Sequence, residues 1–228
     1  MRLCRILCLV LAVWVASAGV AQAESLADLI QTGGTLTAGD KTFGNFSFIC
    51  VAGNCAAEGI TPTNISVIPT FVDGTGFLQF GGDMISGSAV DFWLRYSVSA
   101  SAGLIDMIDQ SFQLSNAGGG NIIIGEDVRL PGPGPFLGQI VANSSISFVF
   151  GQGTDCCDPN PEDGDDLIVN PPQSLLFVTK DVNIVPLLGA QVGTSVLIQS
   201  FHQVPEPTSL ILLGAGLAGL AIWRRRAL

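Results

Sequence analysis

The stretch AVDFWLRYSVS, residues 89–99, decides the fold class of this chain. Apolar and polar side chains alternate along it with a period of two, which is the period of a strand with one buried face. The side chains expected in the core are Val90, Phe92, Leu94, Tyr96 and Val98. The opposite face carries Asp91, Trp93, Arg95 and Ser97. The pattern therefore predicts an antiparallel strand with one core face and one solvated face.

Eight further runs of the same type follow or precede this stretch, at residues 42–51, 65–72, 76–80, 104–114, 122–130, 140–150, 174–184 and 194–203. Clusters of Gly, Asp and Pro separate them, for example at 73–74, 81–83, 118–120 and 131–135. One short helix is indicated at 25–30, capped by Ser25 and ended by Gly33 and Gly34. Residues 151–172 are expected to form a long irregular loop. Nine strands without intervening amphipathic helices predict an all-β fold, an antiparallel β-sandwich or jelly roll.

The N-terminus has the three parts of a secretory signal peptide. Arg2 and Arg5 are followed by an apolar run at 6–15, and Ala21 and Ala23 supply the small residues that signal peptidase requires. The apolar run is shorter than the ~20 residues that span a membrane. We therefore expect residues 1–23 to be removed by signal peptidase, and residues 24–203 to form an exported β-rich domain.

The expected domain is strongly acidic. Its basic residues are Lys41, Arg95, Arg129 and Lys180. They stand against 18 acidic residues, which gives a formal charge of −14. Such a surface repels the phosphates of DNA and RNA, so nucleic acid is not expected as a partner.

Four cysteines remain after the signal peptide: Cys50, Cys55, Cys156 and Cys157. Export to an oxidising compartment makes disulfides the expected state. We predict a bond between Cys50 and Cys55 across the intervening turn. The alternative is a pair of bridges from these two to Cys156 and Cys157, since a bond between adjacent cysteines strains the peptide. The spacing does not favour zinc.

An acidic loop is the one candidate metal site in the sequence. The candidate ligands are Asp155, Asp158, Asn160, Glu162, Asp163 and Asp165. Calcium takes six to eight oxygen ligands, and loops of this composition supply them. The loop lacks the Gly and Glu positions of an EF-hand, and the alternative is a solvated acidic loop that keeps strand edges apart. No other cofactor is expected.

The residues required for catalysis are scarce. His202 is the single histidine, and no Gly-x-Ser-x-Gly motif occurs. A glycan-cleaving enzyme would need two carboxylates, for which the candidates are Asp106, Asp109, Glu126 and Asp127. Acids are common on the solvated faces of strands, so we predict that the protein is not an enzyme. Trp93 is the candidate contact for a polysaccharide or a partner protein, unless loops pack over it. Ice binding would instead require a flat row of threonines.

The C-terminus reads VPEPTSLILLGAGLAGLAIWRRR, residues 204–226. Its apolar segment at 209–223 reaches about 22 Å as a helix, less than the ~30 Å hydrocarbon core of a bilayer. It is expected to cross the membrane marginally as a single helix. Arg224, Arg225 and Arg226 would hold the C-terminus in the cytoplasm, with the β-rich domain outside.

The order of these C-terminal parts resembles a PEP-CTERM sorting signal. Val204, Pro205, Glu206 and Pro207 match its motif, and the short apolar segment and the three arginines at 224–226 match its other two parts. The resemblance implies a Gram-negative bacterium that makes exopolysaccharide, recognition of the motif by an exosortase in the inner membrane, and transient anchoring before release to the cell surface or the extracellular space. We predict a non-enzymatic surface or matrix protein with a structural or adhesive role. The alternatives are a polysaccharide- or ice-binding module and, third, a carboxylate-dependent glycan enzyme.

Overall fold

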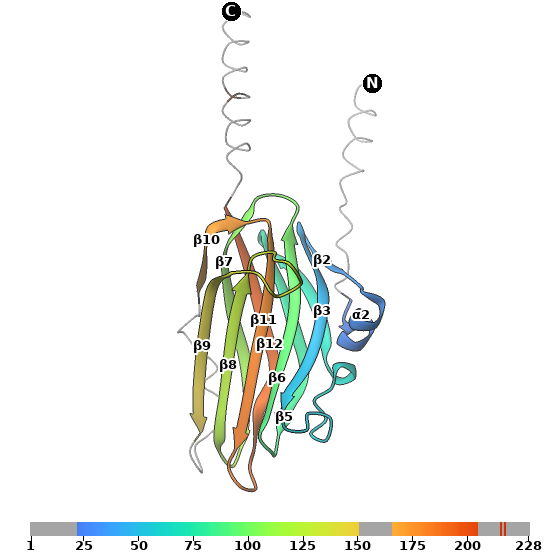
Figure 1. Cartoon of the computed structure of the whole chain (residues 1–228), viewed down its shortest axis with the longest axis vertical. Helices are drawn as coiled ribbons and strands as arrows, with labels where there is room; N and C mark the ends of the chain where they lie inside the picture. Colours follow the sequence, from blue (N-terminus) through green and yellow to red (C-terminus); the bar gives the residue numbers. More distant parts are fainter. Residues whose placement is uncertain (1–21, 151–165, 205–214, 216, 218–228) are drawn as a thin grey trace, which may run out of the picture.

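The computed structural model describes residues 22–150, 166–204, 215 and 217. In this part of the chain two antiparallel sheets pack face to face (Figure 1). The elements are β1 (Glu24–Ser25), α2 (Leu26–Thr32), β2 (Leu36–Ala38), β3 (Lys41–Ala52), the 3-10 turn η1 (Pro62–Asn64), β4 (Ser66–Val72), β5 (Thr75–Ser86), β6 (Val90–Ala100), β7 (Leu104–Ala117), β8 (Gly120–Arg129), β9 (Ile140–Phe150), β10 (Leu167–Gln173), β11 (Leu175–Pro186) and β12 (Gln191–Val204).

The strand order is that of a jelly roll with two added edges. Sheet A has the order β1-β4-β5-β12-β7-β10, and sheet B has the order β2-β3-β6-β11-β8-β9. Four antiparallel strand pairs are nested along the chain. In sheet A, β5 pairs with β12 and β7 with β10, and in sheet B, β6 pairs with β11 and β8 with β9. This arrangement is the double Greek key of a jelly roll. The predicted β-sandwich is therefore confirmed.

All nine predicted strands are present, and two predictions between them are wrong. Residues 81–83 are not a turn, because β5 continues through them to Ser86. Gly82 has φ +148°, and the pairing of β12 with β5 shifts by one residue beside it, as in a β-bulge. The predicted irregular loop at 151–172 contains β10, which pairs with β7 at the edge of sheet A.

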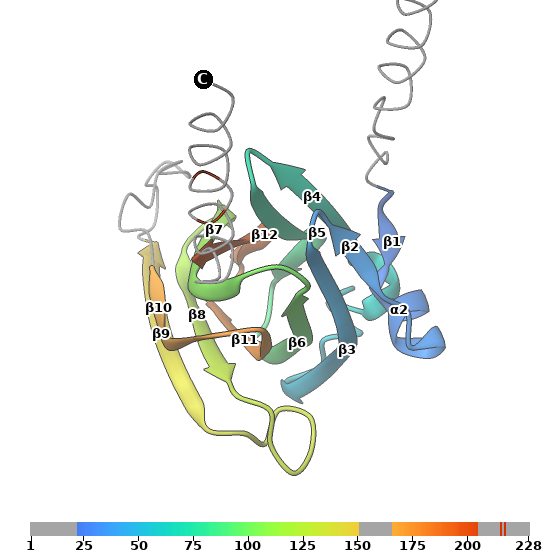
Figure 2. The same cartoon turned by 90° about the horizontal axis from the view of Figure 1, so that it is seen from above.

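The short helix α2 forms as its sequence predicts. The Ser25 hydroxyl accepts a hydrogen bond from the Ala27 amide, and Gly33 ends the helix in the left-handed conformation at φ +65°. Leu26 and Leu29 are buried. Figure 2 shows α2 beside β1 and β3, at the side of the sandwich opposite β9 and β10.

The alternation in residues 89–99 is preserved in β6. Tyr96 is fully buried among aromatic rings of both sheets, with the ring centres of Phe43, Phe46, Phe80 and Phe201 within 6.4 Å of its own. Trp93 and Arg95 lie on the outer face of sheet B and are half-buried. The predicted core face of this strand is confirmed, whereas its outer face is only partly open to solvent, because Ser97 is buried.

Several predicted features lie outside the described residues. They include Ala21 of the cleavage site, Cys156 and Cys157, the six candidate calcium ligands, Pro205 to Pro207, and the three C-terminal arginines. Of the apolar segment 209–223, the structure describes Ala215 and Leu217 alone. Among the helical residues that it does describe, no helix has the length and apolar character needed to cross a membrane. Val204 is the last residue of β12.

Candidate ligand-binding site

A pocket of about 350 Å³ opens on the outer face of sheet B. It is lined by Trp93, Arg95, Gly125, Glu126, Asp127, Arg129, Phe136, Ser144, Ser145, Thr179 and Asp181. These residues come from β6, β11, β8, β9 and the loop at 130–139. The volume lies at the lower end of the usual range for small-molecule sites.

Cross-strand register brings the pocket residues together in two neighbouring rows. In the first row, Asp181 of β11 lies between Trp93 of β6 and Gly125 of β8. In the second row, Thr179 of β11 lies between Arg95 and Asp127. Because residues two apart on a strand share a face, both rows face outward.

The floor of the pocket is made by small side chains. Gly125 pairs with Asp181 on one side and with Ser145 of β9 on the other. A Cβ atom placed at Gly125 would lie 3.5 Å from its nearest neighbour, the Cβ of Asp181, which is an ordinary contact. Packing therefore does not demand glycine at this position, and its missing side chain hollows the centre of the sheet face.

The guanidinium of Arg95 is held by two aromatic rings. Its central carbon lies 4.3 Å from the centre of the Trp93 ring and 5.5 Å from that of Phe136. These cation–π contacts are attractive and strengthen as water is excluded. Burial, and then the nearby charge of Arg129, lower the pKa of Arg95.

The loop at 130–139 supplies Phe136 and covers one end of the pocket. Figures 1 and 2 show this loop standing over the outer face of sheet B, where it crosses in front of β11. Phe136 packs edge-on against Phe177 of β11, with 5.3 Å between ring centres. Arg129 donates to the Gly138 carbonyl at 3.2 Å and forms an ion pair with Asp127 at 2.8 Å. Arg129 thus holds the loop against the sheet and neutralises the carboxylate of Asp127 in the pocket.

Asp181 holds a proton more tightly than an ordinary aspartate. Burial raises its pKa to about 6, and the neighbouring carboxylates of Asp91 and Asp127 add to the shift. Hydrogen bonding to Trp93 opposes it. The pocket therefore contains a carboxyl group that titrates close to neutral pH.

The four carboxylates predicted as catalytic candidates do not form one cluster. Glu126 and Asp127 are adjacent in β8, so their side chains lie on opposite faces of sheet B. Glu126 points into the core and Asp127 into the pocket. Asp106 and Asp109 belong to β7 in the other sheet. Asp127 is the one candidate whose side chain faces the pocket.

Glu126 belongs to a polar network between the two sheets. Its carboxylate binds the ammonium of Lys180 at 2.7 Å and accepts a hydrogen bond from Gln199. Lys180 also donates to Gln110, and Tyr96 donates to Gln199 at 2.5 Å. All five side chains are buried. Burial, together with the charge of Glu126, raises the pKa of Tyr96, and the network links sheet A to sheet B through hydrogen bonds.

His202 is not part of a catalytic triad in the described structure. Its Nε2 lies 3.1 Å from the Ser200 hydroxyl, on the outer face of sheet A. The carboxylate of Asp109 is hydrogen-bonded to Ser200 rather than to the imidazole. Burial, and then the charge of Asp166, raise the pKa of Asp109. The acid that would orient the histidine in a triad therefore contacts the serine instead.

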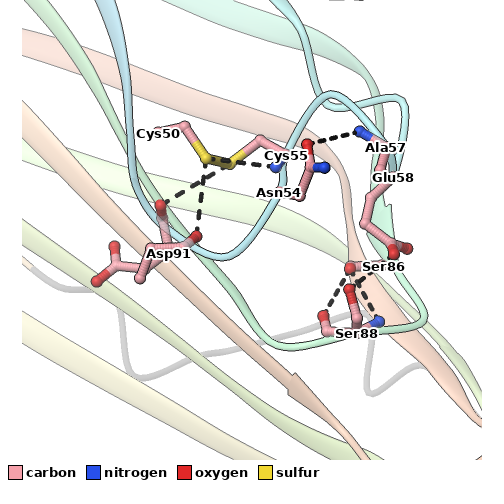
Figure 3. Close-up of a disulfide and its surroundings, with 9 residues drawn as sticks. Cys50, Asn54, Cys55, Ala57, Glu58, Ser86, Ser88 and Asp91 are labelled. Carbon is pink, nitrogen blue, oxygen red and sulfur yellow. Dashed lines mark hydrogen bonds between the residues drawn. A yellow bond between two sulfur atoms is a disulfide. The ribbon is translucent and has the colours of Figure 1, made fainter.

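The predicted disulfide between Cys50 and Cys55 is present, with Cα atoms 6.1 Å apart (Figure 3). The Cys55 amide donates to Cys50 Sγ at 3.3 Å, and Cys55 Sγ lies 3.9 Å from the Asp91 carbonyl oxygen. Glu58 ties the same loop to the β5–β6 connection, because its carboxylate accepts hydrogen bonds from Ser88 Oγ at 2.7 Å and the Gly87 amide at 2.8 Å. The loop thereby braces the end of β6 that leads into the pocket.

Neither a calcium site nor an ice-binding row is formed by the described residues. Residues 22–150 and 166–204 contain no group of three His, Cys, Asp or Glu side chains that could hold a metal ion. Thr37 of β2 and Thr42 of β3 are cross-strand partners, but the next residue across the sheet, on β6, is Ser99. Thr194 is buried.

Sequence reasoning identified Trp93 and the carboxylate of Asp127 but missed most of the other pocket residues. Arg129, Asp181, Thr179 and Gly125 come from strands whose register a single sequence does not specify. One signal was available. Arg95 and Arg129 are the only arginines between residues 24 and 203, and in an acidic domain two isolated arginines are candidates for a specific role.

Comparison with known proteins identifies the C-terminal segment. No curated protein matches the chain. A solved structure of the bacteriophage CBA120 tailspike protein 4 enzymatically active domain is similar at 10% identity and a TM-score of 0.29, covering 68% of this chain and 19% of that one. TmCBM61 in complex with β-1,4-galactotriose is similar at 10% identity and a TM-score of 0.24, covering 76% of this chain and 90% of that one. Neither score is high enough to carry an argument.

Residues 203–226 match the family described as the PEP-CTERM protein-sorting motif. The match begins within β12 and covers the four motif residues, the apolar segment and the three arginines. The chain is therefore a PEP-CTERM motif-containing protein, and the motif implies export, membrane-associated sorting in a Gram-negative bacterium, and processing by an exosortase.

Proposed function

We propose that this protein is a non-enzymatic polysaccharide-binding module that the PEP-CTERM system delivers to the cell surface or the extracellular matrix. A structural or adhesive role there follows from binding to exopolysaccharide. The observation that carries the proposal is the pocket on the outer face of sheet B, lined by Trp93, Arg95, Asp127 and Asp181.

The pocket combines the groups that sugar recognition uses. Trp93 and Phe136 offer apolar ring surface to the C–H groups of a sugar ring. Arginine, aspartate and threonine side chains beside them donate or accept hydrogen bonds to hydroxyl groups. A few convergent polar groups around an apolar wall are typical of a ligand site.

The site stands on a rigid scaffold. Its floor lies on strands β6, β11 and β8 of sheet B, each hydrogen-bonded to strands on both sides. The disulfide loop at 50–59 and the ion pair between Arg129 and Asp127 hold the surroundings of the floor in place. Preorganisation of this kind reduces the entropy lost on binding.

Affinity electrophoresis tests the proposal. The full chain, exported in a Gram-negative host and purified in mild detergent, is run through native gels that contain a panel of polysaccharides. We expect at least one polysaccharide to retard the protein, and Trp93→Ala to abolish the retardation. Phe71→Ala is the matched control, because Phe71 is an exposed aromatic residue on sheet A.

Two results would contradict the proposal. One is that no polysaccharide retards the protein. The other is that Trp93→Ala migrates like the unmodified protein in every gel while circular dichroism shows the same fold.

A carboxylate-dependent glycan enzyme is a second candidate, and one observation favours it. Asp181, with a pKa of about 6, lies in the same pocket as Asp127. A carboxyl group with a raised pKa keeps a protonated fraction closer to neutral pH than an ordinary aspartate, and in that form it can serve as a general acid. Release of reducing ends from a bound polysaccharide, lost in Asp181→Asn while binding is kept, would establish the enzyme in place of the binding module.

A further inference from the structure

We propose that the pocket on sheet B selects acidic saccharides, with Arg95 pairing with an anionic group on the sugar. This inference rests on the proposed polysaccharide binding and adds the class of ligand. The anionic group is a carboxylate or a sulfate, because the planar guanidinium of Arg95 fits both.

The distribution of charge in the domain first indicates an anion. Four basic residues stand against 18 acidic ones between residues 24 and 203. Lys41 and Lys180 are buried and paired, with Asp40 and Glu126 respectively. Both remaining cations, Arg95 and Arg129, line one pocket. The accessible positive charge of this acidic domain is thus gathered in a single place.

Arg95 has no anionic partner among the residues that the structure describes. Its side chain forms no ion pair and no hydrogen bond there, and its Nε atom is buried without an acceptor. A buried donor without a partner is costly and is rare in folded proteins. The two aromatic contacts stabilise the cation but accept none of its N–H groups in the way that an oxygen does.

The neighbouring carboxylates are engaged elsewhere. Asp127 pairs with Arg129 at 2.8 Å. Asp181 is hydrogen-bonded to Asp91 and to its cross-strand partner Trp93, and burial and the charge of Asp91 raise its pKa. The charge that influences Arg95 most is that of Arg129, which has the same sign. An anionic ligand would relieve this repulsion and satisfy the unpaired donor.

Arginine is better suited than lysine to this position. Its guanidinium is planar, contacts aromatic rings through its face and keeps N–H donors in its plane for a bidentate bond. A carboxylate on a sugar ring packed near Trp93 would meet these donors at the pocket wall. The aromatic rings would bind the sugar, and Arg95 would distinguish acidic sugars from neutral ones.

The experiment compares polysaccharides that differ in charge but share a backbone. Polygalacturonate is paired with its methyl ester, and dextran sulfate with dextran, in affinity gels at 0.15 M salt. At this ionic strength the Debye length is about 8 Å, so repulsion by the domain's overall charge is largely screened. The proteins are the full chain in mild detergent, Arg95→Gln, Arg95→Lys and the charge-matched control Gln113→Glu. Gln113 is exposed on sheet A, and its change alters the net charge by the same amount as Arg95→Gln.

We expect an acidic polysaccharide to bind about tenfold or more tightly than its neutral counterpart. Arg95→Gln should remove this preference, Arg95→Lys should weaken it, and Gln113→Glu should keep it. Binding of polygalacturonate identifies the anion as a carboxylate, and binding of dextran sulfate alone identifies it as a sulfate.

Binding of neutral polysaccharides alone, still dependent on Trp93, would overturn the inference and leave the proposed function intact. Equal binding of acidic polysaccharide by Arg95→Gln and by the unmodified protein, with the same circular dichroism spectrum, would also overturn it. If no polysaccharide binds, both the inference and the proposed function are wrong.

Discussion

Lys180 and Glu126 are cross-strand partners in β11 and β8, and the Lys180 ammonium lies 2.7 Å from the Glu126 carboxylate inside the sandwich. Both side chains are almost completely shielded from water. The polar network to which they belong joins two sheets whose other contacts are mainly apolar. Buried charges of this kind depend on each other, because neither is tolerated without its partner.

Removing the cation should therefore destabilise the fold strongly. Lys180→Met leaves the Glu126 carboxylate buried without its counter-ion, and we expect a loss of about 3–5 kcal/mol in the free energy of unfolding. Urea denaturation measures it. The double variant Lys180→Met with Glu126→Leu should be more stable than Lys180→Met alone. A single variant within about 1 kcal/mol of the unmodified protein would show that the ion pair contributes little.

Filling the floor of the pocket should block binding without harming the fold. Gly125→Val places methyl groups where the sheet face is hollow, and its Cβ has room in the structure. We expect affinity for the polysaccharide to fall about tenfold or more, because the new side chain occupies the ligand's place. Stability should stay the same or rise, since valine favours strands. Ser111→Val, on the exposed face of sheet A, is the control and should bind normally.

Stability should depend on pH through Asp181. Its pKa is raised from 3.8 to about 6 in the folded protein. The folded state thus binds a proton more tightly than the unfolded state, and this contribution is complete below about pH 4 and lost as the pH rises through 6. Asp181→Asn should remove this contribution. Compared with the unmodified protein, the variant should therefore have a lower Tm at pH 4 relative to its Tm at pH 7. Identical Tm profiles for the two proteins would contradict the assignment.

The disulfide between Cys50 and Cys55 should contribute modestly to stability. It closes a very short loop, and the entropy removed from the unfolded chain corresponds to about 2 kcal/mol. Cys50→Ala with Cys55→Ala should lower the free energy of unfolding by about that amount. A reducing agent should produce a similar loss in the unmodified protein and no change in the double variant. A reductant effect that persists in the double variant would point to other cysteines.

The sorting motif should determine the final location of the protein. Replacing Pro205, Glu206 and Pro207 together by alanine should retain the protein in the inner membrane at its unprocessed size. Immunoblots of membrane and extracellular fractions from the native host measure this. Deletion of the exosortase should give the same result. If neither change alters size or location, the motif is not used as a sorting signal.

The strands could be predicted from the sequence, because buried and less buried residues alternate along much of their length, as in β8 and most of β5. Register shifts interrupt the alternation in β3 and β12 without ending the strands. β10 could not be predicted, since Asn170, Pro171 and Pro172 argue against a strand, and an edge position tolerates prolines that a central one excludes. Gly81 and Gly82 suggested a turn because glycine weakens the interior of a strand and is common in turns. A Cβ at Gly82 would lie 2.4 Å from the Asn64 carbonyl oxygen, so glycine there permits a bulge within a continuous strand.

The pocket depends on information that one sequence does not contain. Trp93 was identifiable from the face it occupies on its own strand. Asp181 and Gly125 lie beside it through the register of β6, β11 and β8, which are far apart along the chain. Lys180 and Glu126 occupy inward positions of their strands, and only the pairing of those strands shows how two charges share the core.

The place where the sorting motif begins has a mechanical consequence. Gln203 and Val204 still pair with β7, and β12 lies between β5 and β7 in sheet A. A force applied along β12 at its Val204 end would load the hydrogen bonds on both sides of the strand in shear rather than opening them one after another. A load applied through the sorting segment would thus enter the sandwich by a strand that is paired on both sides, and resistance to force would be set by how fast the whole domain unfolds.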